Sequence, residues 1–452
     1  MSGIATTTLL LAALSAANPK DPKIPIERYQ LDNGLKVVMS EDHSAPIVTV
    51  YITYRVGSAA EKEGLTGFAH LFEHMMFNGS KDVPEGGFAW YVDGTGGILN
   101  GNTEPDRTNY FETVPSNFLE GMLYLESNRM QNLGITEEAL DNEKQVVKEE
   151  VRQQQENQPF LKTILLDWPA TAFSSWEYSH SIYGSMDDLN NAPVQAFKDF
   201  FSRWYVPNNA TLVIVGDFDP KNAKELVGKY FAAIPKGEEN PGTFPAEKKQ
   251  TEAVYKKVED PLAPFPAIIM SWDIPPPRTA DRDALDVLAK VLASGASSRL
   301  RKRLIDEDKS ALEVIMQPGF PIPTYGPGQL ALLAIANGDA TPEKIRAALW
   351  EEIEKVQREG ISKDELDRAL TKLKVEYTQT LGDTLFKASE LATYETFFGG
   401  ADKWPKEIDR LQKLKPLDLQ RVAREYLTKE ASVTFDILPP AGNTSMGMGM
   451  GG

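Results

Sequence analysis

A repeat at one long offset constrains the fold of this 452-residue chain more than any other feature. The segment Arg203–Ala210 recurs as Arg424–Ala431, with Arg, Tyr and Ala at matching positions 221 residues apart. In both copies a helix-like stretch precedes the segment and a β-rich run follows it. A single offset of this length predicts two homologous halves rather than a short-period solenoid.

The boundary between the halves is expected near residue 240, where a cluster of Pro, Gly and charged residues interrupts the pattern. We assign 23–235 to a first domain, 236–250 to a linker and 251–440 to a homologous second domain. The tail 441–452 lacks an apolar period and is expected to be disordered.

Residues 1–22 could be a signal peptide or a flexible N-terminus. The run Thr6–Ala17 is apolar, rich in small residues and about as long as a signal-peptide core, but no Lys or Arg precedes it. We therefore expect a periplasmic or secreted protein, with a cytoplasmic location as the alternative. No apolar run reaches the roughly 18 to 20 residues of a membrane span.

Strand and helix patterns interleave irregularly in each half. Leu35–Met39 and Ile47–Tyr54 have the apolar, β-branched pattern of strands, whereas Asn117–Leu133 has helical spacing and stops at Gly134. This irregular order favours an α+β sandwich over a doubly wound sheet.

Charge and cysteine content exclude several classes of function. The net charge of -17 repels polyanions, so nucleic acid is not expected as a partner. The chain has no cysteine, which excludes disulfides, zinc ribbons and thiol nucleophiles. Any metal site must consist of His, Asp and Glu.

Two of the four histidines lie in one apolar segment, Leu65–Phe77, which predicts a buried helix with Thr66 as its N-cap. His70 and His74 are four residues apart, so they project from the same side of that helix. Burying His70, Glu73 and His74 there is costly unless they are paired or bind a metal. The plainer alternative is a pair of core histidines with satisfied hydrogen bonds.

A third metal ligand is available downstream. Thr136–Gln155 predicts an amphipathic helix in which Glu143 and Glu150, two turns apart, lie on or beside the apolar stripe. The stripe includes Leu140, Val146, Val147 and Val151. Glu149 points more toward solvent, and a wholly solvated acidic face is the alternative for this helix.

Two imidazoles and one carboxylate, with a fourth position left to water, match the ligand set of a catalytic zinc. Glu73 adjoins His74 and suits a general base, which would take a proton from water and pass it to a leaving amine. Glu143 would lie behind the ligands and orient one of them or raise its basicity.

The motif His70-x-x-Glu73-His74, with Glu143 and Glu150 downstream, resembles the pitrilysin or insulinase family of zinc peptidases, especially the branch of mitochondrial processing peptidase. The resemblance extends from about Tyr29 to Pro439. It implies two homologous α/β-roll sandwich domains, each an antiparallel sheet packed with helices, that face a central cavity. It also implies one zinc ion held by His70, His74 and Glu150, with Glu73 as the base.

The resemblance further implies that an edge strand receives the substrate, since an extended peptide can add to a free sheet edge. That implied strand consists of Gly97, Ile98, Leu99, Asn100 and Gly101. From the residues alone, the stretch would be a Gly/Asn turn.

The second half carries no second metal motif. If Gly79 is aligned with Gly295, the three motif residues align with Asp286, Ala289 and Lys290. That half could contribute to a cavity without copying the zinc chemistry.

Members of the family that this sequence resembles usually carry an Arg and a Tyr that bind the substrate when they act alone. In this sequence the corresponding positions are Ile305 and Leu312. Neither side chain can donate a hydrogen bond. We therefore expect a homologous second subunit, in a heterodimer, to supply the pair. The alternatives are a shifted register or substitution by nearby residues, namely Arg299, Arg301, Arg303 or Tyr325.

The sequence thus predicts a zinc endopeptidase that cleaves peptides or unfolded segments in an enclosed cavity. The alternative is a non-catalytic core or peptide-binding subunit of a larger complex.

Overall fold

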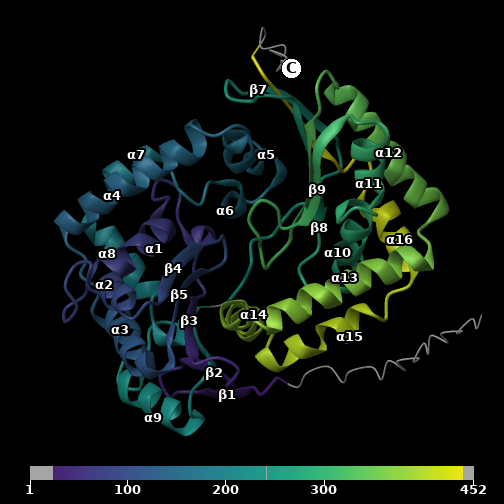
Figure 1. The fold of residues 1–452 in the computed structure, drawn as a ribbon. Helices are drawn as coiled ribbons and strands as arrows, with labels where there is room; N and C mark the ends of the chain where they lie inside the picture. Colours follow the sequence, from purple (N-terminus) through teal and green to yellow (C-terminus); the bar gives the residue numbers. More distant parts are fainter. Residues whose placement is uncertain (1–23, 241, 441–452) are drawn as a thin grey trace, which may run out of the picture.

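The computed structural model describes residues 24–240 and 242–440, which form two halves of mixed helices and strands. Figure 1 shows the halves facing each other, the first in purple to teal and the second in green to yellow. The proposed N-terminal segment 1–22 and the tail 441–452 lie outside the described residues.

The first half is built on a six-stranded sheet with the order β1-β2-β6-β3-β5-β4, in which only β2 and β6 are parallel. Its strands are β1 (Glu27–Gln30), β2 (Lys36–Glu41), β3 (Ile47–Tyr54), β4 (Ile98–Thr103), β5 (Thr108–Pro115) and β6 (Ala210–Gly216). The two strands predicted in this half are present, and β3 has the predicted bounds.

The second half has a five-stranded sheet with the order β7-β11-β8-β10-β9. Its strands are β7 (Val254–Glu259), β8 (Ala267–Ile274), β9 (Ala311–Pro318), β10 (Gly328–Ala336) and β11 (Val433–Leu438). Without β1, the first sheet has the same topology, since β7 and β11 are again the parallel pair. The predicted fold class, two homologous α+β sandwiches, is confirmed.

Helices cover these sheets. In the first half they are α1 (Phe68–Asn78), α2 (Gly87–Gly94), α3 (Leu119–Asn132), α4 (Glu137–Val151), α5 (Pro169–Ala172), α6 (Trp176–Ser179), α7 (Met186–Asn191), α8 (Val194–Trp204) and α9 (Pro220–Phe231). In the second half they are α10 (Ala280–Ala293), α11 (Arg299–Arg301), α12 (Pro342–Glu359), α13 (Lys363–Leu381), α14 (Thr384–Phe397), α15 (Glu407–Leu411) and α16 (Pro416–Tyr426). Short π-helical turns lie at Arg152–Glu156, Thr163–Asp167 and Lys302–Glu307.

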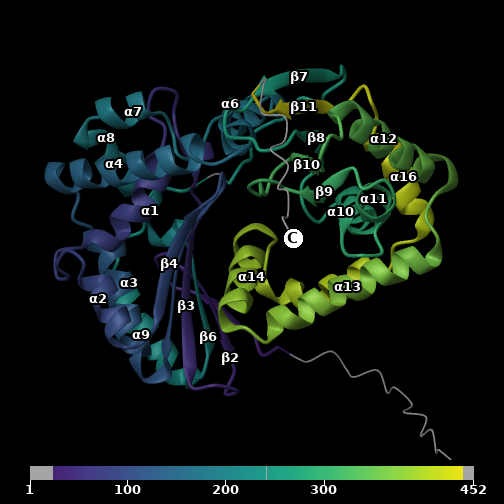
Figure 2. The same ribbon diagram turned by 45° about the horizontal axis from the view of Figure 1, so that its top comes forward.

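Each half covers one face of the other half's sheet. Helix α14, from the second half, buries Leu391 and Ala392 against the first sheet (Figure 2). In return, Phe160 and Trp168 from the first half pack on the second sheet, where Trp168 Nε1 donates to Ser271 Oγ at 3.0 Å. A strand with apolar residues on both faces needs a packing layer on each face, because each Å² of apolar surface left in contact with water forgoes about 25 cal/mol of folding free energy.

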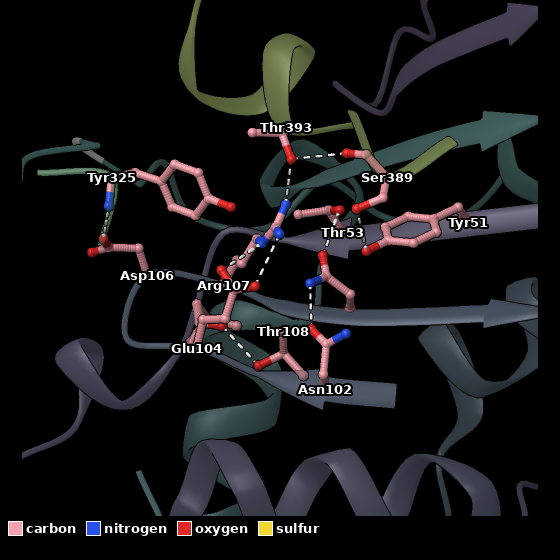
Figure 3. Close-up of polar contacts among 12 residues, drawn as sticks. Tyr51, Thr53, Asn102, Glu104, Asp106, Arg107, Thr108, Tyr325, Ser389 and Thr393 are labelled. Carbon is pink, nitrogen blue, oxygen red and sulfur yellow. Dashed lines mark hydrogen bonds and ion pairs between the residues drawn. The ribbon is translucent and has the colours of Figure 1, made fainter. Parts of the chain in front are cut away.

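A polar joint ties the halves together near β5 and α14 (Figure 3). The buried Arg107 donates from Nη1 to Thr393 Oγ1 at 2.6 Å, and its guanidinium lies 4.9 Å from the ring centre of Tyr325. Beside it, Asp106 accepts hydrogen bonds from the Tyr325 amide at 2.6 Å and the Tyr178 hydroxyl at 3.0 Å. Residues far apart in sequence are thereby fixed to one loop of the first half.

Two local predictions were wrong. Helix α1 has Gly67 as its N-cap, not Thr66, whose hydroxyl donates instead to Asp188. Val146, assigned to the apolar stripe of α4, is 50% exposed, because the stripe that packs inward passes through Leu140 and Val147. Among the described residues, no helix is both long enough and apolar enough to span a bilayer.

Candidate metal centre

The first turn of α1 is held by a side chain from outside the helix. Gly67 adopts φ 87°, and its amide and that of Ala69 donate to the Glu61 carboxylate at 2.9 and 2.8 Å. Glu61 is buried, and burial raises its pKa. His180 Nε2 lies 3.2 Å from the same carboxylate, so a second segment is fixed to the start of this helix.

Three predicted ligands converge between α1 and α4. Glu150 Oε2 lies 3.1 Å from His74 Nε2 and 3.6 Å from His70 Nε2, and one ligand atom from each residue lies within 4.8 Å of the others. Zinc–ligand bonds of about 2.0 to 2.1 Å in tetrahedral geometry separate ligand atoms by about 3.3 Å. The two distances from Glu150 lie on either side of that value, and the two histidine nitrogens lie within the 4.8 Å limit, so the three residues are placed to hold a zinc ion.

The electrostatics of the site also suit a cation. Burial lowers the pKa of His70 to about 4, which leaves the imidazole neutral and its nitrogen free to bind a metal. A hydrogen bond from His74 lowers the pKa of Glu150, so this carboxylate is ionised. Among the described residues, no Lys or Arg forms an ion pair with Glu150.

Glu143 lies beside the other nitrogen of His74, with its Oε2 3.6 Å from Nδ1. The two ring nitrogens of His74 therefore face two carboxylates, and Glu143 can orient the ring from behind. Glu149 points away and pairs with Arg152 at 2.8 Å in the solvent, as its position round the helix predicts.

The side chain of Glu73 extends from α1 to the edge strand β4. Its Oε2 accepts a 2.7 Å hydrogen bond from Thr103 Oγ1, and burial raises its pKa. The backbone of β4 passes so close that a Cβ on Gly101 would lie 3.0 Å from Glu73 Cγ. The glycine therefore leaves the space in which the carboxylate sits.

The stretch implied as a substrate strand overlaps β4, which includes Ile98, Leu99, Asn100 and Gly101, whereas Gly97 precedes it. This strand is the last in its sheet and pairs only with β5, so its outer edge has no partner among the described residues. Ile98 is 57% exposed on this edge. The strand that carries Thr103 and Gly101 beside Glu73 is therefore also a free sheet edge.

The segment 180–188 was missed by sequence reasoning. The Ser185 amide donates to Thr66 Oγ1 at 3.0 Å, and Gly184 is so close to Gly67 that a Cβ would collide with that backbone. The Tyr183 ring consequently lies edge-on to His70, with ring centres 4.8 Å apart. After burial, the charges of Glu150 and Glu73 do most to raise the pKa of Tyr183 to about 12.

A loop tyrosine has no periodic pattern to reveal it. The available signals were His180, the fourth histidine of the chain, and the Tyr183-Gly184 pair at a turn. His43, in contrast, lies outside the site, between Glu41 and Asp217 at 2.6 Å each.

The second half does not bring hydrogen-bond donors to the expected positions. Ile305 packs on that half's core, and Leu312 is exposed on β9. Of the proposed substitutes, Arg299 pairs with Glu365 at 2.7 Å and Tyr325 is buried in the joint. Asp286, Ala289 and Lys290 lie on α10, with Asp286 paired to Arg282 at 2.7 Å.

Comparison with known proteins agrees with this architecture. The family model described as insulinase (peptidase family M16) matches residues 36–185, and that of the peptidase M16 inactive domain matches residues 191–373. The zinc protease PqqE of Helicobacter pylori is 28% identical over 440 residues, 96% of this chain and 97% of that protein.

Solved structures share the fold. A protease from Helicobacter pylori is similar with a TM-score of 0.86 and 28% identity, over 92% of this chain and 100% of that one. The periplasmic protease PqqL from Escherichia coli has a TM-score of 0.78 and 20% identity, over 93% of this chain but 48% of that longer chain. With both of its halves matched by models of one family, the chain belongs to the insulinase family of peptidases, M16.

Proposed function

We propose that this chain is a zinc-dependent endopeptidase that hydrolyses peptides or unfolded segments, with one zinc ion held by His70, His74 and Glu150. The observation that carries the proposal is the approach of one Glu150 oxygen to both imidazoles, at 3.1 and 3.6 Å. The name zinc protease given to the relative PqqE supports it.

Each part of the site has a chemical role in this proposal. Zinc, when bound, supplies Lewis-acid chemistry by lowering the pKa of water to about 7 and polarising a carbonyl. Glu73 takes the proton from the attacking water and passes it to the leaving amine. Thr103 holds the Glu73 carboxylate on the side of the incoming peptide, and Glu143 keeps the His74 ring in place.

The substrate binds in extended form along β4. Backbone amides and carbonyls at this edge can pair with any peptide, which gives affinity with little dependence on sequence. Because Glu73 lies against Gly101, a peptide on this edge passes directly over the proposed base.

A homologous partner subunit supplying an Arg and a Tyr remains part of the proposal. Its support is that Ile305 and Leu312, at the expected positions, cannot donate hydrogen bonds. We also propose a periplasmic location, supported by the apolar run Thr6–Ala17, outside the described residues, and by the periplasmic PqqL.

The test is zinc analysis combined with cleavage of a quenched-fluorescent peptide, for the chain alone and with a co-expressed homologue. We expect about one zinc per chain, retained in Glu73→Gln, with activity falling at least about 100-fold. Glu149→Gln, on the solvent side of α4, is the matched control and should keep full activity. A zinc-free chain, or an active Glu73→Gln variant, would contradict the peptidase proposal, and full activity of the chain alone would contradict only the partner.

A further inference from the structure

The start of α1 and the segment 180–188 form one rigid unit. The Thr66 amide donates to Asp188 Oδ2 at 3.0 Å, and the Ser185 amide donates back to Thr66 Oγ1 at 3.0 Å. The backbones of Gly67 and Gly184 touch, and both residues have positive φ, which a larger residue would strain. Every one of these contacts lies within two turns of His70.

This unit places one side chain against the metal centre. Tyr183 projects from it with its ring perpendicular to that of His70, at an interplanar angle of 81° and a centre distance of 4.8 Å. The ring is only partly buried, and no described residue forms a hydrogen bond with its hydroxyl. Burial, followed by the negative charges of Glu150 and Glu73, raises the pKa of the Tyr183 hydroxyl.

Peptide hydrolysis needs a hydrogen-bond donor near the oxygen of the scissile carbonyl. Attack on the scissile carbonyl turns its oxygen into an oxyanion, which is stabilised by hydrogen-bond donors aimed at it. At the start of α1, the amides of Gly67 and Ala69 already donate to Glu61. A phenol, with an ordinary pKa near 10, is protonated at neutral pH and can donate.

We propose that Tyr183 is a further catalytic residue of this chain, whose hydroxyl donates a hydrogen bond to the substrate carbonyl oxygen as it becomes an oxyanion. The inference rests on the peptidase function proposed above. No bond to Tyr183 forms or breaks, and the phenol keeps its proton throughout. It supplies from this chain one of the donors that the second half lacks at Ile305 and Leu312.

The test uses the full-length, zinc-loaded chain as wild type, Tyr183→Phe and Tyr124→Phe, the last removing a hydroxyl from an exposed tyrosine of the same half. Three measurements are made: steady-state kinetics (kcat and KM) on a quenched-fluorescent peptide, the Kd of a phosphinic peptide that imitates the tetrahedral oxyanion, and the absorption spectrum after replacement of zinc by Co²⁺. Thermal unfolding checks that each variant is folded.

For Tyr183→Phe we expect kcat to fall about 100-fold with KM within about threefold, because the donor acts on the oxyanion and not on the ground state. The phosphinic peptide should bind at least about 10-fold more weakly, and the Co²⁺ spectrum should be unchanged. Tyr124→Phe should match wild type in all three measurements.

Several results would overturn the inference. Equal kcat and equal phosphinic-peptide affinity in Tyr183→Phe would show that the hydroxyl makes no contact with the oxyanion. A changed Co²⁺ spectrum would make Tyr183 a metal ligand instead of a donor. If the wild type binds zinc but cleaves nothing even together with the co-expressed homologue, the peptidase proposal fails, and the phosphinic-peptide affinity still decides whether Tyr183 binds such a ligand.

Discussion

Thr103 donates a 2.7 Å hydrogen bond from Oγ1 to Oε2 of Glu73, so the last residue of the free edge strand holds the proposed catalytic base. The strand on which a peptide would lie and the group that would act on that peptide therefore share one contact. Thr103 is buried, so water cannot replace its hydroxyl there.

Replacing Thr103 with Val keeps the side-chain shape and removes this donor. We expect kcat to fall roughly 10-fold, because the carboxylate loses its orientation, while KM and zinc content change little. Thr103→Ser retains a hydroxyl and should recover most of the activity. Steady-state kinetics with metal analysis measure both, and a Val variant with unchanged kcat would show that the bond does not position Glu73.

Gly101→Ala tests the space that Gly101 leaves for Glu73. The added methyl would lie 3.0 Å from Glu73 Cγ and 3.2 Å from the Asn109 carbonyl oxygen, so we expect the carboxylate to be displaced and activity to fall about 10-fold or more. Gly94→Ala is the control, because nothing lies within 4 Å of its Cβ position. Equal peptidase activity in the two variants would contradict the prediction.

Gly184→Ala tests the attachment of the segment 180–188 to α1. Gly184 and Gly96 both have positive φ, at 69° and 73°, but only Gly184 meets another backbone. We expect Gly96→Ala to lower the free energy of unfolding by about 1 kcal/mol and Gly184→Ala by about 1 to 3 kcal/mol more. Urea unfolding measures the difference, and equal losses would mean that the contact is easily relaxed.

Asp106 should make stability depend on pH. Burial raises the pKa of Asp106 to about 6 from its ordinary 3.8, so the folded chain binds a proton that the unfolded chain releases. The stability that this proton provides is present below about pH 4 and is lost as the pH rises through about 6. The loss amounts to about 3 kcal/mol.

Asp106→Asn keeps an oxygen that can accept from Tyr325 and Tyr178 but cannot ionise. Relative to wild type, its free energy of unfolding should therefore rise between pH 4 and pH 7. Urea titrations at each pH unit measure this, and a difference between the two proteins that does not vary with pH would contradict the assigned direction.

Patterns within one element were the parts of the fold that the sequence could predict. The apolar surroundings of His70 and His74 predict a buried helix, and the spacing of Glu150 places a carboxylate on the inward side of α4. The offset between the halves predicts the repeated sheet topology. Each of these predictions depends only on residues within a few helical turns of one another, or on a direct match between the residues of the two halves.

What the sequence could not predict depends on contacts between distant segments. The N-cap of α1 is Gly67 rather than the expected Thr66, and the carboxylate of Glu61, upstream in the sequence, accepts hydrogen bonds from the amides at this end of the helix. Tyr183 lies in a loop, where no periodicity shows which way a side chain points. The covering of the first sheet by α14 joins residues more than 150 positions apart.

Because each half packs on one face of the other half's sheet, cutting the chain in the connection near residue 240 would affect both halves. Neither fragment would keep a complete interior. Leu391, from the second half, packs on the sheet of the first half, and Trp168, from the first half, packs on the sheet of the second. Two pieces made by a nick should stay associated, and two pieces synthesised separately should find each other only by folding together. The molecule is thus a natural candidate for reconstitution from split fragments.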